Sequence, residues 1–116
     1  MKTDRELVEA AAKAACNGAQ WYEGLGMCID LGLSIPLFWN PLTDDGDALR
    51  LAAQLRLQIS PRFEATTSGD RYAVLAEQPA WHGKGEAWGR DVCAATRRAI
   101  VLAAAVMVGA PAVGAA

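Results

Sequence analysis

The sequence predicts an α+β fold, in which three helices pack with a small, mainly antiparallel sheet of three to four strands in the order α-β-α-β-β-α. Apolar residues recur at helical spacing in three segments, and alternating stretches before the last of them are separated by the turn residues Ser68-Gly69-Asp70. A chain of 116 residues, 53% of them hydrophobic, can bury one core without disulfides. We therefore expect a single domain over residues 1–109 and an alanine-rich flexible tail over 110–116.

The first helix is expected over residues 4–16. Thr3 and Glu6 have the spacing of a capping box, and Asn17-Gly18 can end the helix. A first strand or hairpin follows, with Met27-Cys28-Ile29 as its strand-like part. Three aromatic residues in or near this region are expected to pack in the core and not to form a concave aromatic site: Trp21, Tyr22 and Trp39.

The stretch from Leu31 to Phe38 is apolar but broken by glycine and proline, so it either covers the core or forms an exposed contact loop. Pro41 then constrains the entry to a second helix over residues 44–56, which Thr43 is expected to cap. Three carboxylates at this helix start suit the helix dipole better than a metal site, because the ligand spacing of a calcium loop is missing: Asp44, Asp45 and Asp47. The residues expected to face the core are Leu49, Ala52, Ala53 and Leu55.

Three strands are expected after this helix, over residues 57–59, 62–67 and 71–78, and a third helix from a cap at Asp91 to Gly109. This last helix is apolar around most of its circumference, which suits either central burial or the seam of a possible homodimer. Arg97 and Arg98 diverge by roughly 100° around it and are expected to face solvent.

Charge and cysteine content limit the classes of function. A net charge of -2 indicates neither a nucleic-acid-binding face nor a mimic of DNA, so no nucleic-acid partner is predicted. The cysteines are odd in number and lack paired spacing, which favours a reducing compartment and small core residues: Cys16, Cys28 and Cys93. Residues 99–116 carry no charge, but their glycines and proline favour a buried helix with a loose tail over a membrane segment.

The best candidate for a binding surface is the segment 78–90, which we expect to be a long loop. Its tryptophans could stack on a base or anchor a protein partner, and its cations could meet phosphate or carboxylate. The competing interpretation is that both indoles fold back and seal the sheet edge. The candidate binding residues are Trp81, His82, Lys84, Trp88 and Arg90. No catalytic residues, metal ligands or cofactor are predicted, because His82 has no evident nucleophile beside it in sequence.

Four segments together resemble a family of small uncharacterised proteins of tailed bacteriophages and prophages: Asp4-Arg5-Glu6-Leu7, Gly24 to Asp30, Trp39 to Ala48, and Ala94 to Val101. The layout is also similar to the phage α-β-α sandwich domain and to NinX-type proteins. The resemblance implies a phage origin and an α+β fold. It carries over no catalytic residues, and the chain departs from the family pattern in the stretch Leu31 to Phe38 and in the loop Pro79 to Arg90.

Two classes of function follow as expectations. The first is a non-enzymatic phage accessory protein that binds a host protein in the host cytoplasm and inhibits or redirects it, for example in an anti-CRISPR-like counter-defence role. The alternative is a small-ligand protein that binds or sequesters a nucleotide through the tryptophans and nearby cations. An exposed apolar patch would favour the first class, and a deep pocket joining tryptophan to arginine would favour the second.

Overall fold

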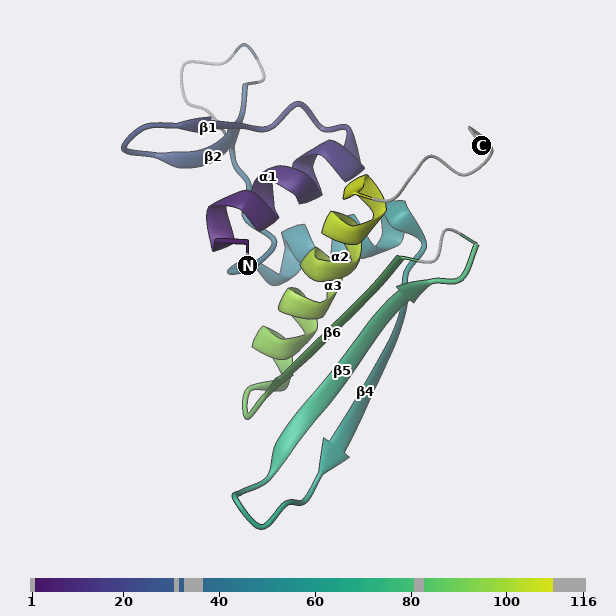
Figure 1. The fold of residues 1–116 in the computed structure, drawn as a ribbon. Helices are drawn as coiled ribbons and strands as arrows, with labels where there is room; N and C mark the ends of the chain where they lie inside the picture. The colour runs from purple at the N-terminus through teal and green to yellow at the C-terminus, as the bar shows by residue number, and fades with distance from the viewer. Residues whose placement is uncertain (1, 31, 33–36, 81–82, 110–116) are drawn as a thin grey trace.

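The computed structural model describes residues 2–30, 32, 37–80 and 83–109. This part of the chain forms three helices and two antiparallel sheets of three strands each, which confirms the α+β fold (Figure 1). The helices are α1 (Asp4–Ala15), α2 (Asp45–Leu55) and α3 (Val92–Gly109). The strands are β1 (Gln20–Tyr22), β2 (Gly26–Ile29), β3 (Leu37–Phe38), β4 (Gln58–Glu64), β5 (Arg71–Gln78) and β6 (Gly83–Gly89).

The larger sheet has the order β4-β5-β6, so that β5 is central and β4 lies at one edge. Strand β5 lies where the sequence predicts it. The connection before it is longer than the expected Ser68-Gly69-Asp70 turn, because β4 ends at Glu64 and the hydrogen-bonded turn runs from Thr66 to Gly69. The two short strands expected over 57–59 and 62–67 are instead one strand, β4, with Pro61 opposite Val74 in the middle of it. Proline is tolerated there because an edge strand pairs on one side only and does not need every N–H group.

The expectation of a long loop over residues 78–90 is wrong, because most of it forms strand β6. Its glycines indicate a close approach of two backbones rather than turns. A Cβ on Gly85 would overlap the carbonyl oxygen of Ala99 and the amide nitrogen of Ala103 in α3, and a Cβ on Gly83 would overlap the Met107 side chain. Glycine in a strand interior often marks such an approach.

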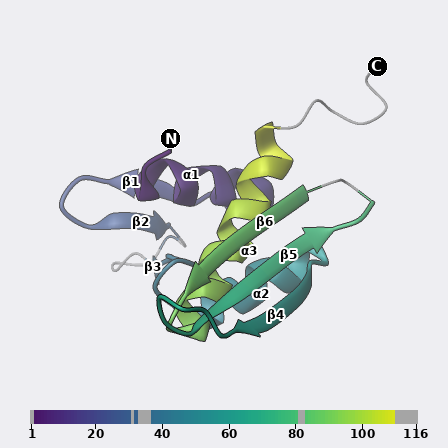
Figure 2. The same ribbon diagram turned by 60° about the horizontal axis from the view of Figure 1, so that its bottom comes forward.

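Helix α3 is the centre of the molecule. It lies mainly over β6 and β5, while α1 and α2 pack against it from the side away from the sheet (Figures 1 and 2). Asp91 caps it as expected, since its Oδ1 accepts hydrogen bonds from the backbone N–H groups of Cys93 (2.9 Å) and Ala94 (3.3 Å). Central burial of residues 99–101 and 103–105 accounts for part of its apolar circumference, whereas Val106 is 45% exposed and Val108 39% exposed. The possible homodimer stays a prediction.

The capping box of α1 is confirmed, and the left-handed residue that ends this helix is Cys16, with φ 53°. The N-cap of α2 is Asp44 rather than Thr43, because the Asp44 side chain accepts the N–H of Asp47 at 2.8 Å. Leu49 was expected in the core, but it is 67% exposed. Ala53 is exposed as well, whereas Ala52 is buried and Leu55 is partly buried against the core, as expected. The buried face of α2 also includes Ala48 and Leu51.

Two expectations about single side chains are also wrong. Only Cys28 is a buried thiol, because Cys16 lies at a helix end and Cys93 on an open side of α3, where both are exposed. Arg97 does not face solvent, since its side chain is only 18% exposed and hydrogen-bonds across to the α2 start. Arg98 is more exposed and pairs with Asp4 at 3.1 Å.

The smaller sheet, β1-β2-β3, contains the strand that the sequence predicts over 27–29. Leu37 and Phe38 of β3 are more than half exposed. The rest of the stretch 31–38, apart from Gly32, lies outside the described residues, as does the tail expected over 110–116. Within the described ranges, every helix is too short or too polar to cross a membrane.

Candidate functional site

Of the five residues that the sequence singles out, the structure describes three: Lys84, Trp88 and Arg90. Trp81 and His82 lie outside the described residues, so their part of the prediction is not tested. Lys84 and Trp88 extend from β6 on the face of the sheet that points away from α3, because the alternate residues of this strand are buried against the helix. Arg90 follows the strand and lies beside the turn at Gly69.

The outer face of the larger sheet carries charges of both signs in close pairs. Arg62 lies 3.4 Å from Glu64 and 3.8 Å from Glu86, and Arg71 lies 3.2 Å from Glu64. Lys84 lies 4.0 Å from Glu77. Such pairs on an exposed face contribute little to stability, but they neutralise the cations that a phosphate group would need.

Trp88 does not fold back to seal the sheet edge, since 51% of it is exposed. The Arg71 guanidinium lies over its ring, 5.7 Å from the centroid, which is within the range of a cation–π contact. This contact orients the indole and leaves it on the surface. Trp88 is thus an exposed aromatic side chain on a charged face.

Trp21 and Trp39 do not form the concave aromatic site considered near the first strand together, because they line separate cavities of about 160 Å³ and about 270 Å³. Trp39 is in the core, with 6% exposure. Trp21 is half-buried under the guanidinium of Arg5, 4.5 Å from its ring centroid, and borders a cavity of about 160 Å³ that Trp39 does not line. Core packing is therefore the role that the structure supports for Trp39.

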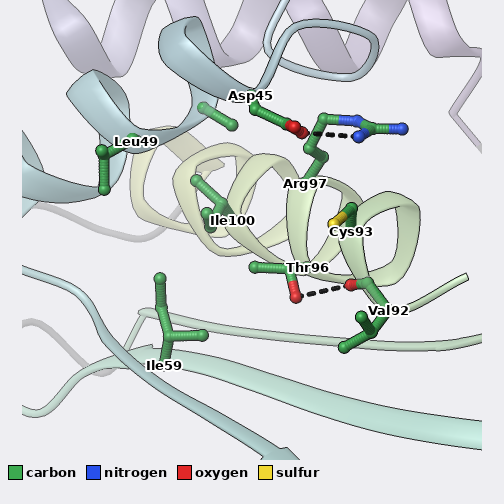
Figure 3. Close-up of a pocket in the computed structure, with 9 residues that line it drawn as sticks. Asp45, Leu49, Ile59, Val92, Cys93, Thr96, Arg97 and Ile100 are labelled. Atoms are coloured by element: carbon green, nitrogen blue, oxygen red, sulfur yellow. Dashed lines mark hydrogen bonds and ion pairs between the residues drawn. The ribbon is translucent and has the colours of Figure 1, made fainter.

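A groove with apolar walls lies between α2, α3 and β4, and has a volume of about 270 Å³ (Figure 3). Leu49 of α2 forms one side and Ile59 of β4 the opposite side. The floor is the face of α3 that carries Val92, Thr96 and Ile100. The groove is thus an open space in the middle layer of the molecule, beside α3.

The groove exists because α3 leaves β4 uncovered. Strands lie about 4.8 Å apart and a helix with its side chains is about 10 Å wide, so one helix covers two strands but not a third. The α3 helix lies over β6 and β5. The inner face of β4 therefore stays open beyond Ile59, where Pro61 is exposed and Phe63 is 60% exposed.

The polar side chains of the groove already have partners. The Thr96 hydroxyl donates to the carbonyl of Val92 at 2.7 Å. The Arg97 guanidinium donates through Nε to the carbonyl of Leu42 at 2.8 Å and through Nη1 to Asp45 Oδ1 at 2.6 Å. These bonds fix the rim of the groove and leave its surface suited to apolar contact.

The sequence contains one signal for this groove that our sequence analysis missed. Ala48, Leu51, Ala52 and Leu55 form a stripe with the spacing of one helix face, and Leu49 lies about 100° away from its neighbour Ala48. A large apolar residue outside the buried stripe of a helix is a candidate for a contact surface. The exposure of Phe63 has no comparable signal, because it depends on where α3 crosses the sheet.

Comparisons with known proteins add no assignment: a scan against protein-family models, a search of curated proteins and a search of solved structures each found no match. Within the described part of the chain, no group of three or more His, Cys, Asp or Glu side chains is placed to hold a metal ion. What remains to indicate a function is the shape and chemistry of the protein surface.

Proposed function

We propose that the protein is a non-enzymatic binding protein that engages another protein through the apolar groove between α2, α3 and β4. The observation that carries this proposal is the combination of a groove with apolar walls and a large apolar side chain on one side of it, Leu49, that is 67% exposed. Protein interfaces concentrate their binding energy in a few apolar anchors that fill such pockets.

The resemblance to phage proteins supplies the biological setting of the proposal. In that setting the partner is a host protein in the host cytoplasm, and binding inhibits or redirects it, as in counter-defence. The alternative, nucleotide binding at the tryptophan-rich segment, has less support. Two cations on the outer face of the sheet, Arg71 and Lys84, are each within 4.0 Å of a glutamate, which reduces their capacity to bind a phosphate group.

The proposal is tested by capture of partners from a bacterial host lysate with tagged full-length protein. Leu49→Asp places a charge on the groove, and Trp88→Ala is a matched control on the outer face of the sheet. Both positions are more than half exposed, so both variants are expected to keep the native fold, which circular dichroism checks. We expect one stoichiometric partner that binds the parent protein and Trp88→Ala but not Leu49→Asp.

Two outcomes would contradict the proposal. A partner that is lost with Trp88→Ala and kept with Leu49→Asp would place the contact on the outer face of the sheet. Absence of any stoichiometric partner, in lysates of several candidate hosts, would argue against a protein-binding role.

A further inference from the structure

Strand β6 forms one side of the larger sheet, opposite β4 (Figure 2). Alternate residues of such an edge strand direct their N–H and C=O groups away from the sheet. Within the part of the chain that the structure describes, the backbone–backbone hydrogen bonds of residues 83–89 are those of the pairing with β5. The outer edge of β6 can therefore accept one more strand.

The two edges of the sheet differ in their capacity to pair. Strand β4 carries Pro61 in its middle, which has no N–H group to donate and is one of the devices by which proteins block an edge. Residues 83–89 contain no proline. Strand β6 is consequently the edge on which further pairing is favourable.

The charges of β6 indicate which strand fits it. Lys84 and Glu86 extend from the outer face on either side of Gly85. We propose that two copies of the chain pair through β6, antiparallel about a two-fold axis at Gly85, and so form one continuous six-stranded sheet. In this register Lys84 of each copy lies directly opposite Glu86 of the other. A lysine alone would oppose edge pairing, but here each lysine meets a carboxylate, and opposite charges across two strands stabilise the pair.

The inner face of β6 leaves room for the second copy. In the same register Gly85 lies opposite Gly85 and Gly83 opposite Ala87, so only small residues meet beneath the helices. Helix α3 lies over β6 and β5, which places its axis about half a strand spacing, ~2.4 Å, inside the edge. The two α3 axes would then be about 9 to 10 Å apart, which is close to the usual distance between packed helices.

The side of α3 above this edge carries apolar side chains that such packing would cover. Ile100 lines the groove on the β4 side of α3, and Leu102 points about 200° away from it, toward the edge of β6. The Leu102 Cβ is accordingly only 2.8 Å from a Cβ built on Gly85. Leu102 is partly buried, and Val106, one turn further along, is 45% exposed. In the dimer Leu102 of both copies meets near the axis, with Val106 beside it.

A second copy fits this edge better than an unrelated strand does. The edge requires a carboxylate opposite Lys84, a cation opposite Glu86 and an apolar surface against α3, and β6 with its own α3 supplies all three. The inference does not depend on the proposed function. Since the groove lies at the β4 side of the sheet, the pairing leaves it open, and the dimer presents two grooves.

The test measures the oligomeric state of the full-length protein by sedimentation velocity from low to high micromolar concentration. Lys84→Glu places glutamates opposite each other across the axis, and Glu86→Lys places lysines there. Both side chains are exposed, so both variants are expected to keep the native fold, which circular dichroism checks. A mixture of the two variants has opposite charges at both pairs again. The control is Arg62→Glu, which reverses a charge on the same face at the far edge, in β4.

We expect the parent protein and Arg62→Glu to dimerise, each β6 variant alone to dimerise about tenfold or more weakly, and the equimolar mixture to recover the dimer. A parent protein that stays monomeric throughout would overturn the inference. A dimer that both β6 variants retain at full strength would place the interface elsewhere and overturn it as well. A mixture as weak as the single variants would show that the reversals act within one chain, which also contradicts the pairing.

Discussion

Gly85 allows α3 to lie directly on β6, and Gly85→Ala tests this packing. A Cβ at this position would overlap two backbone atoms of α3, the Ala99 oxygen and the Ala103 nitrogen, and would lie 2.8 Å from the Leu102 Cβ. Ordinary carbon contacts begin at about 3.5 Å. Because the atoms in the way belong to two backbones, no side-chain rotation relieves the overlap, and α3 must move away from the sheet by roughly 1 Å.

That displacement weakens the packing of the most buried helix. A gap of 0.5 to 1 Å forfeits about a quarter to a half of each contact energy, and the residues of α3 that face the interior, such as Ala99, Ala103 and Ala104, are fully buried. Overpacked core substitutions typically destabilise by about 1 to 3 kcal/mol. We expect Gly85→Ala to lower the free energy of unfolding by about 3 kcal/mol or more, at or above the upper end of this range, and to lower Tm by about 10 °C or more.

Two other glycines of the same strand provide graded controls. A Cβ at Gly89 meets nothing within 4 Å, so Gly89→Ala is expected to change stability by less than about 0.5 kcal/mol. A Cβ at Gly83 meets the flexible Met107 side chain first, so Gly83→Ala is expected to fall between the two. Urea and thermal unfolding measure all three variants. If Gly85→Ala is as stable as Gly89→Ala, the close approach of α3 to β6 is refuted.

Three further predictions concern stability and exposure. Phe63→Ala is expected to lower the free energy of unfolding in urea by at most about 1 kcal/mol, because the main interaction lost is the edge-on contact with Tyr72, whose ring centroid is 5.5 Å away. A decrease of about 3 kcal/mol or more would show that Phe63 belongs to the core. Asp47→Ala is expected to cost about 2 kcal/mol in the same assay, because its carboxylate, only 11% exposed, accepts the N–H of Asn40 at 2.9 Å; an unchanged midpoint would contradict this. In thiol titration of the native protein, Cys16 and Cys93 are expected to react rapidly, and Cys28 only on unfolding. Rapid reaction of all three thiols would disprove the burial of Cys28.

The parts of the fold that the sequence predicts correctly are set by local chemistry. The capping box of Thr3 and Glu6 and the cap at Asp91 each act within a few residues, so their structure follows from neighbours in the chain. Strand β6 could not be predicted in this way. Its glycines are unfavourable for a strand considered alone, and they are explained only by the backbone of α3, which lies beyond them in sequence and above them in space.

The candidate groove was only partly predictable for the same reason. The buried stripe of α2 excludes Leu49 by helix geometry alone, so its exposure could be inferred from the sequence. The pattern of β4 places Ile59 and Phe63 on the inner face of the sheet, where burial is the usual outcome. Whether that face is covered depends on the position of α3 across the strands, and no local pattern determines it.

The glycines of β6 and the groove at β4 have a common physical cause. On the inner face of the sheet, β6 presents Gly83, Gly85 and Ala87, whereas β4 presents Ile59, Pro61 and Phe63. A helix packs most closely where the strand carries the smallest side chains, so α3 lies over β6 and away from β4. The bulky apolar residues of β4 are thereby left beside the helix instead of beneath it. The packing that stabilises the centre of the molecule thus also creates the open apolar surface that we propose as the docking site.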